Sequence, residues 1–277
     1  MTLSPKRLTD ALKGFLEEDL ATGDLSTSAL PPQLVHGDFV VKHAGVIVGQ
    51  CLPDAVYQLL GPKCHYTPTV PDGTLVPQGT VIGQASGPVA DLLAGERTIL
   101  NLMQRMSGIA TATHLAVTTL NDPSIGILDT RKTAPGLRLF DKYAVQCGGG
   151  INHRMGLYDA VMLKDNHWHL ITDFPATVRR LRQLCGPTKT IEVEVATRDQ
   201  LQAAIASQVD MIMIDNQTPA TARAWRKIIP TSIKVEVSGG ITPTKLPAYA
   251  GSGIDFISLG YLTNSVQALD IAFNLTD

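Results

Sequence analysis

The stretch "IEVEVATRDQLQAAIASQVDMIMIDN", residues 191–216, decides the fold of this chain. It holds two short apolar runs, "IEVEV" and "MIMI", separated by a segment long enough to form a helix. Parallel strands need a crossover of about a dozen residues or more, which is usually a helix. The stretch therefore predicts a strand–helix–strand unit. Similar apolar runs recur after Pro123: "IGIL" (125–128), "AVML" (160–163), "IKVEV" (233–237) and "FISL" (256–259).

Consecutive units with buried strands predict either an open doubly wound sheet or a barrel. No GxGxxG pattern opens any of the predicted helices, which disfavours a dinucleotide-binding sheet. The first part of the chain has a different texture. A helix is predicted from Ser4 and Pro5 to near Gly23, β-like runs occupy residues 37–86, and a long helix is predicted from Val89 to Leu120. We therefore expect a mixed helix-and-sheet domain at 1–112 and a parallel α/β domain at 113–277.

Bulk composition limits the classes of partner. The net charge of the 277-residue chain is −2, so nucleic acid and acidic membrane surfaces are not expected partners. The sequence contains no run of 18 apolar residues, so no transmembrane helix is expected. Charges interrupt the apolar runs of the amino-terminal segment, so no signal peptide is expected either. The four cysteines are widely spaced, which indicates reduced thiols in a cytoplasmic protein. A catalytic role for Cys147 is a minor alternative.

Charged residues or glycine turns follow every apolar run. The cation-rich segment "LDTRKTAPGLR" (128–138) follows the first run. In parallel α/β folds the carboxyl ends of the strands meet where ligands bind. We therefore interpret these residues as the mouth of a site and not as solvated loops. The residues in question are Asp129 to Lys132, Lys164-Asp165, Glu194, Asp215-Asn216, Ser238-Gly239-Gly240 and Gly260.

This predicted mouth is bipolar. Cations gather on the early units, at Arg131, Lys132, His153, Arg154 and Lys164, and carboxylates on the later ones. Arginine forks match carboxylate or phosphate oxygens, and Mg²⁺ is typically held by one or two carboxylates together with ligand oxygens. The glycine turn offers backbone N–H groups to a phosphate. The pattern predicts a site for a small multi-anion beside a Mg²⁺-bound phosphorylated ligand.

Each feature also has a structural interpretation. Glu194 could form a core salt bridge with Lys164, and Asp215 could cap a helix. The glycines at 148–150 could form only a flexible turn, which would leave His153 and Arg154 on the surface.

Longer blocks of sequence resemble a known family. "LDTRKTAPGLRLFDKYAVQCGGGINHRMGLYDAVMLKDNH" (128–167) closely resembles the core block of quinolinate phosphoribosyltransferase. "EEDLATGDLST" (17–27), "GERTILNLMQRMSGIAT" (95–111), "MIMIDN" (211–216), "EVSGGI" (236–241) and "GIDFISLGYLTNS" (253–265) resemble its other blocks, in order. The resemblance implies an N-terminal α/β sandwich domain followed by an incomplete parallel α/β barrel. It also implies a homodimer or larger homo-oligomer.

The resemblance further implies transfer of phosphoribosyl from phosphoribosyl pyrophosphate to quinolinate, with release of CO₂ and pyrophosphate. By position, the implied quinolinate ligands are Arg97, Thr130, Arg131, Lys132, His153, Arg154 and Lys164. Lys132, Glu194 and Asp215 are the implied catalytic residues, and the two carboxylates would organise the donor's ribose and Mg²⁺. The implied contacts of the donor's 5-phosphate are Ser238, Gly239, Gly240, Leu259, Gly260, Tyr261 and Asn264. Asn264 stands where many relatives have His, so its phosphate contact would be weaker.

Three other functions fit parts of the pattern. Lys164 could be the Schiff-base lysine of an aldolase-type barrel, because a strand-end lysine suits that role. The chain could instead be a non-catalytic ligand-binding relative. The strongest alternative is a related phosphoribosyltransferase acting on another pyridine or pyrimidine carboxylate.

Overall fold

The computed structural model describes residues 4–276, which form two compact units. The first contains the described residues up to His114, Thr133–Gly149 and the residues from Leu262 onward; the second contains Leu115–Lys132 and Gly150–Tyr261. The predicted division had a single boundary after residue 112. The two later segments belong with the first unit because one supplies core side chains to it and the other supplies a strand, as described below.

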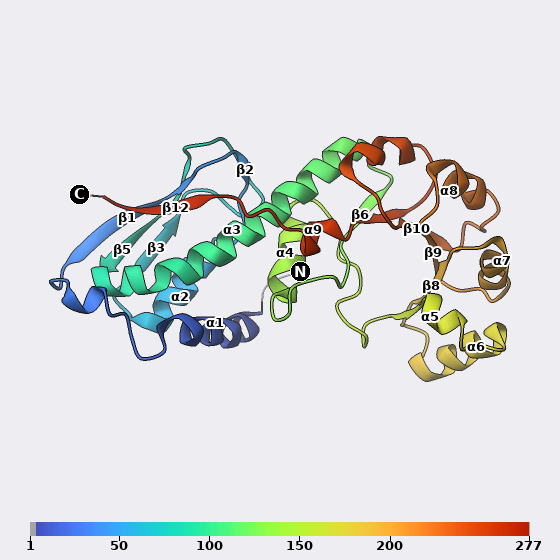
Figure 1. Ribbon diagram of the computed structural model, residues 1–277, viewed down its shortest axis with the longest axis horizontal. Helices are drawn as coiled ribbons and strands as arrows, with labels where there is room; N and C mark the ends of the chain where they lie inside the picture. Colours follow the sequence, from blue (N-terminus) through green and yellow to red (C-terminus); the bar gives the residue numbers. More distant parts are fainter. Residues whose placement is uncertain (1–3, 277) are drawn as a thin grey trace. The chain divides into compact units, whose positions relative to one another are not determined.

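An antiparallel sheet forms the framework of the first unit, with strand order β12-β1-β5-β3 (Figure 1). Its strands are β1 (Leu34–Val41), β3 (His65–Pro68), β5 (Val81–Pro88) and β12 (Ile271–Thr276). Burial alternates along β1, as expected when one face of a sheet packs on a core. A small second sheet pairs β2 (Gly45–Val46) with β4 (Leu75–Val76). The sequence pattern did not predict β12, which pairs with β1 from the far end of the chain.

Helices complete this unit. They are α1 (Pro5–Leu20), α2 (Leu52–Leu60), α3 (Val89–Leu120), α4 (Arg138–Cys147) and the 3₁₀ helix η1 (Thr27–Ala29). Helix α1 begins with Pro5 at its first position, as predicted, and α3 has the predicted bounds. Side chains from helices and strands form one core, to which α4 contributes Phe140, Ala144 and Val145. This packing of helices on a sheet confirms the predicted α/β sandwich.

The second unit is built on a six-stranded parallel sheet with the order β6-β11-β10-β9-β8-β7 (Figure 1). Its strands are β6 (Gly126–Leu128), β7 (Val161–Leu163), β8 (Ile191–Val195), β9 (Met211–Asp215), β10 (Lys234–Ser238) and β11 (Phe256–Ser258). All six correspond to predicted apolar runs. Strands β6 and β7 are the two edges of the sheet and do not pair with each other. The unit is therefore the predicted incomplete barrel.

Helices follow the strands of this sheet. They are α5 (Asp165–Trp168), α6 (Phe174–Cys185), α7 (Arg198–Ala206), α8 (Pro219–Arg226), the 3₁₀ helix η2 (Pro243–Tyr249) and α9 (Tyr261–Asn264). The cap of α8 is Thr218, whose side chain accepts the Thr221 N–H, so the interpretation of Asp215 as a helix cap is wrong. Among residues 4–276, no helix combines the length and apolar character needed to cross a membrane.

Alternation along the strands separates two kinds of side chain. In β8, Ile191, Val193 and Val195 are fully buried on one face. Glu192 and Glu194 lie on the other face, because successive strand residues point to opposite sides. The same alternation places Glu236 and Ser238 of β10 on one face. The acidic and hydroxyl side chains therefore share the concave side of the sheet, where the site lies.

Candidate active site

A cavity of about 430 Å³ opens at the carboxyl ends of the parallel strands. Four strands reach it at or next to their carboxyl ends, through Lys164 after β7, Glu194 of β8, Asp215 of β9 and Ser238 of β10. Its lining residues are Thr130, Arg131, Lys132, His153, Arg154, Met162, Lys164, Asp165, Glu194, Met213, Asp215, Asn216, Ser238, Gly239, Gly240 and Ser258. The predicted convergence of strand ends on one site is therefore confirmed.

Four permanent cations line this cavity: Arg131, Lys132, Arg154 and Lys164. Arg154 is half-buried, and its Nη1 donates a hydrogen bond to the Ala160 carbonyl oxygen at 2.8 Å, which fixes its direction. Burial, and then the nearby charge of Arg131, lowers the pKa of the Arg154 guanidinium. Cations that repel one another in a partly desolvated cavity favour an anionic ligand. The interpretation of this cluster as solvated surface is therefore wrong.

Two carboxylates face these cations. The Glu194 side chain is 16% exposed, and its Oε2 lies 3.8 Å from Lys164 Nζ. The two side chains do form an ion pair, as the structural interpretation expected, but they do so in the wall of the cavity. Burial, followed by the charge of Asp215, raises the pKa of Glu194. A divalent cation between Glu194 and Asp215 would relieve this repulsion, so the donor set fits Mg²⁺.

The turn after β10 is shaped to receive an anion. Gly239 and Gly240 have φ of 93° and 58°, a conformation that residues with a side chain rarely adopt. Successive backbone N–H groups in such a turn form a concave anion site. The helix after the turn is the short 3₁₀ helix η2 and not an α-helix, so the turn itself carries this role.

Some predicted site residues do not line this cavity. Arg97 belongs to the first unit, where its side chain is 58% exposed and lines a different pocket with Glu18 and Asp19. Asn264 also belongs to the first unit. Leu259 has a buried side chain, and neither it nor the following Gly260 and Tyr261 lines the cavity.

Cys147 also lies outside the cavity. It is part of the first unit, and burial, followed by the charge of Asp72, raises the pKa of its thiol to about 11. A thiol with so high a pKa is a poor nucleophile at neutral pH. The structure therefore does not support a catalytic cysteine at this position.

Three lining residues were not predicted as part of the site: Met162, Met213 and Ser258. Asp165 and Asn216 also line the cavity, as expected from their places directly after Lys164 and Asp215, although no specific role was predicted for them. The period-two alternation of a strand also places Met213 on the same face as Asp215.

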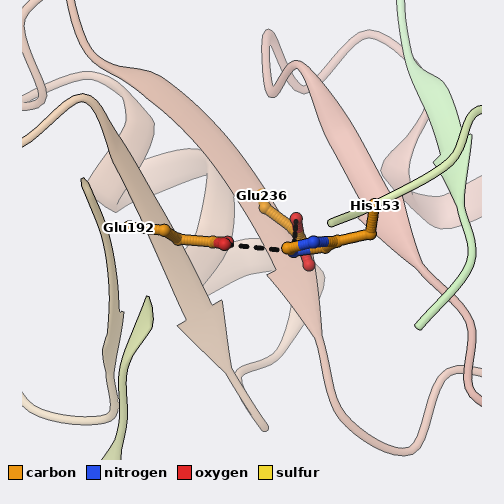
Figure 2. Close-up of side chains that lie close together, drawn as sticks. All are labelled: His153, Glu192 and Glu236. Atoms are coloured by element: carbon orange, nitrogen blue, oxygen red, sulfur yellow. Dashed lines mark ion pairs between the residues drawn. The ribbon is translucent and has the colours of Figure 1, made fainter. Parts of the chain in front are cut away.

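Beneath the cavity lies a buried cluster of one imidazole and two carboxylates. Figure 2 shows His153, Glu192 of β8 and Glu236 of β10 pointing toward one another. His153 Nε2 lies 3.0 Å from Glu192 Oε2 and 3.5 Å from Glu236 Oε2. The His153 side chain is 10% exposed and the two glutamates are almost fully buried, so the interpretation of His153 as a surface residue is wrong.

The hydrogen bond that His153 Nδ1 accepts argues against a metal ion in this cluster. The ligand-type atoms lie within 4.8 Å of one another, which is close enough for a small metal ion. However, His153 Nδ1 accepts the Arg154 backbone N–H at 2.6 Å, so the ring hydrogen lies on Nε2. A nitrogen that carries a hydrogen has no lone pair for a metal. Burial, and then the charge of Glu192, raises the pKa of Glu236 well above its ordinary value.

Comparisons with known proteins agree with the fold and the site. A family model described as quinolinate phosphoribosyl transferase, C-terminal domain, matches residues 109–274, and the N-terminal domain model matches 24–107. The chain is 46% identical over 271 residues to a probable carboxylating nicotinate-nucleotide pyrophosphorylase of Bacillus subtilis, covering 98% of this chain and 94% of that one. It is 38% identical to the carboxylating nicotinate-nucleotide pyrophosphorylase of Mycobacterium leprae, covering 96% of each chain.

A solved structure gives the same result. The nicotinate-nucleotide pyrophosphorylase from Francisella tularensis matches with a TM-score of 0.94 and 34% identity, covering 99% of this chain and 98% of that one. Both domains of the family are therefore present, in the order and over the length of these relatives. The chain belongs to the quinolinate phosphoribosyl transferase family.

Proposed function

We propose that the chain transfers phosphoribosyl from phosphoribosyl pyrophosphate to quinolinate and releases CO₂, giving nicotinate mononucleotide and pyrophosphate for NAD synthesis. The observation that carries this proposal is the bipolar cavity, in which four cations face Glu194 and Asp215 beside the Ser238–Gly240 turn. The names of the relatives agree with this assignment, since they are carboxylating pyrophosphorylases that make or cleave nicotinate nucleotide.

The cations suit a dicarboxylate. Arg131, Arg154 and Lys164 would receive the carboxylates of quinolinate, because arginine forks bind carboxylate oxygens in pairs. Thr130 would add a hydroxyl contact, and His153 would hold the backbone of Arg154 in place. Lys132 would lie between quinolinate and the sugar donor. The contact of Lys164 with a carboxylate suits an anion-binding ammonium better than the free amine that a Schiff base requires.

The sugar donor would occupy the acidic side of the cavity. Glu194 and Asp215 would bind its ribose hydroxyls and Mg²⁺, and Mg²⁺ would neutralise charge on the departing pyrophosphate. The Ser238–Gly240 turn would receive the 5-phosphate. Leu259, Gly260 and Tyr261 would support that phosphate through the backbone.

The chemistry needs positioning more than a nucleophile. The quinolinate ring nitrogen attacks the sugar C1 as the bond to pyrophosphate breaks, through a centre with oxocarbenium character. Cations and carboxylates fixed around the cavity place the two reactants and stabilise the charges that move. The ring nitrogen then carries a positive charge. When the neighbouring carboxylate departs as CO₂, its bonding electron pair stays on the ring carbon as a carbanion that the adjacent positive charge stabilises, and a proton then adds to that carbon.

We also infer a homodimer in which Arg97 from one subunit completes the quinolinate site of the other. Arg97 supports this inference because its side chain is 58% exposed, lines a pocket of the first unit and is not among the residues that line the proposed site. We also propose a cytoplasmic location, which the four free thiols support because disulfides are rare in that compartment.

Product analysis tests the proposed function. The chain is incubated with Mg²⁺, phosphoribosyl pyrophosphate and quinolinate, and the products are identified by mass spectrometry. We expect nicotinate mononucleotide, and a mononucleotide that retains both carboxylates would refute decarboxylation.

A further inference from the structure

Asn216 has an unusual backbone conformation for its position. It directly follows Asp215 at the end of β9 and has φ of 52°, in the left-handed region. Residues other than glycine rarely adopt this region, although asparagine does so more readily than most. Within residues 4–276, the other non-glycine residues with positive φ are Ala21, Asn121 and Gln208, and none of these lines the cavity.

Two hydrogen bonds and one close packing contact connect Asn216 to both halves of the proposed donor site. Its backbone N–H donates to the Ser238 carbonyl oxygen at 3.0 Å, which ties the end of β9 to the end of β10. Its side-chain Nδ2 donates to Asp215 Oδ2 at 2.7 Å. Its Oδ1 packs against Gly239, where an added Cβ would overlap the Asn216 amide.

The chemistry of the groups fixes the direction of this amide. An ionised carboxylate only accepts hydrogen bonds, so the NH₂ group of Asn216 must face Asp215. The amide oxygen then faces Gly239. One side chain therefore lies between a carboxylate and the glycine turn, and both of these neighbours line the same cavity.

We propose that Asn216 is a positioning residue, which holds the Asp215 carboxylate and the Ser238–Gly240 turn in a fixed arrangement that matches the sugar donor. This inference rests on the proposed function, in which one donor molecule spans both groups. A ligand that must contact two groups at once gains affinity when those groups are already held at the right spacing. A ligand that contacts only one of them gains nothing from the spacing.

The variant Asn216→Gly separates the amide from the backbone conformation. Glycine accepts positive φ without strain, so the chain keeps its path while both side-chain contacts disappear. Asn121→Gly is the matched control. Asn121 has a φ of 49°, follows the end of α3 and does not line the cavity. The melting temperatures of both variants should be similar to each other and close to that of the wild type.

The readout is binding measured by calorimetry, without turnover. For Asn216→Gly we expect affinity for Mg²⁺ and phosphoribosyl pyrophosphate to fall about tenfold or more, the effect of losing a hydrogen bond to a charged group. Affinity for inorganic phosphate, which needs only the turn, should stay within about twofold. Quinolinate affinity should also be unchanged, and Asn121→Gly should match the wild type for every ligand.

Three results would overturn the proposal. Equal losses for phosphate and for the donor would mean that Asn216 contacts phosphate directly. Unchanged donor binding in Asn216→Gly would mean that the amide has no role, and a comparable loss in Asn121→Gly would mean that the effect is general. The wild type assayed for turnover in parallel separates these results from failure of the proposed function, because such failure would appear as wild type that forms no mononucleotide from quinolinate.

Discussion

Arg154 shows how one side chain can be prepared for a carboxylate. Its guanidinium is aimed by the Ala160 carbonyl, and its backbone N–H is held by His153. Charged hydrogen bonds contribute about 1.5–3 kcal/mol each, so Arg154→Ala should lower kcat/KM for quinolinate by tenfold to a hundredfold or more. Arg154→Lys should recover only part of the loss, because lysine lacks the planar fork. Steady-state kinetics measure both variants, and wild-type values for Arg154→Ala would place the residue outside the site.

Glu194 and Asp215 should act on the donor and not on quinolinate. Glu194→Gln and Asp215→Asn keep the shape of each side chain but remove the charge that would hold Mg²⁺. We expect a higher KM for phosphoribosyl pyrophosphate and a higher Mg²⁺ requirement. Calorimetry with quinolinate alone should give wild-type affinity. Weaker quinolinate binding in either variant would contradict this assignment.

Glu236 should make stability depend on pH. Burial, followed by the charge of Glu192, holds the pKa of Glu236 well above its ordinary value of about 4.5. At pH values between about 4.5 and the folded-state pKa of Glu236, the folded state therefore binds more protons than the unfolded state. The free energy of unfolding falls as pH rises through this window. Glu236→Gln removes the titrating group, so its stability relative to the wild type should increase from about pH 4.5 upward. It should level off above the folded-state pKa.

Denaturant unfolding at a series of pH values measures this difference. Glu17→Gln provides the control, because Glu17 is exposed on α1. Its unfolding curves should follow those of the wild type. If the stability of Glu236→Gln ran parallel to the wild type at every pH, the pKa of Glu236 would not be raised in the folded state.

Among individual residues, those at the ends of strands could be predicted from the sequence. Those brought together by the pairing register of the strands could not. Lys164, Glu194 and Asp215 could be predicted because each lies at or next to the carboxyl end of an apolar run. The cluster of His153, Glu192 and Glu236 could not, because β8 and β10 are separated by β9 and their depth depends on the pairing. Asn216 was expected at the mouth of the site, but its positioning role was missed because nothing in its spacing reveals a positive φ.

Helix α3 illustrates how a glycine sets the packing of a whole element. At Gly108 an added Cβ would overlap the Gln267 carbonyl oxygen, so the segment before β12 approaches the helix backbone directly. Gly14 on α1 has no atom near its missing Cβ. Gly108→Ala should destabilise the protein by about 1–3 kcal/mol through overpacking. Gly14→Ala should stabilise it by about 0.5–1 kcal/mol through helix propensity.

Denaturant midpoints of the two variants provide the measurement. Because both variants replace glycine by alanine in a helix, opposite signs of the change in unfolding free energy separate the effect of packing from that of helix propensity. Equal stabilisation at both positions would show that α3 has room for a side chain at Gly108.

Elements with a local pattern were predictable and those paired at long range were not. The bounds of α3 and the six parallel strands followed from apolar spacing within short windows. Strand β12 was missed because its six residues gain their structure only by pairing with β1. Helix α4 was likewise not predicted, because the cation-rich segment just before it was interpreted only as part of a binding site.

At the scale of the whole molecule, the inferred dimer makes a prediction about shared sites. If Arg97 completes the site of a partner, the Arg97→Ala and Lys132→Ala homodimers should both be nearly inactive. A mixed dimer would have one site with both lesions and one with neither. Exchange of subunits should restore about a quarter of wild-type activity when half of the dimers are mixed.

Native mass spectrometry confirms the exchange in the same samples. No recovery of activity despite confirmed mixed dimers would mean that Arg97 serves its own chain or lies outside catalysis.

The domain organisation was only partly predictable. The sequence indicated two domains, yet segments 133–149 and 262–276 return to the first unit. Such returns depend on core contacts and strand pairing between distant residues. The resemblance of long sequence blocks to a family predicted the two architectures more completely than local patterns did.

The central claim is that the cavity selects a dicarboxylate and removes one of its carboxylates. The most direct measurement offers the enzyme an equal mixture of quinolinate, labelled in its 2-carboxylate, and nicotinate, with Mg²⁺ and phosphoribosyl pyrophosphate. Labelled CO₂ and mononucleotide are then counted. We expect one labelled CO₂ for each mononucleotide formed, with nicotinate left almost unused. Comparable consumption of nicotinate, or mononucleotide formed without CO₂, would contradict it.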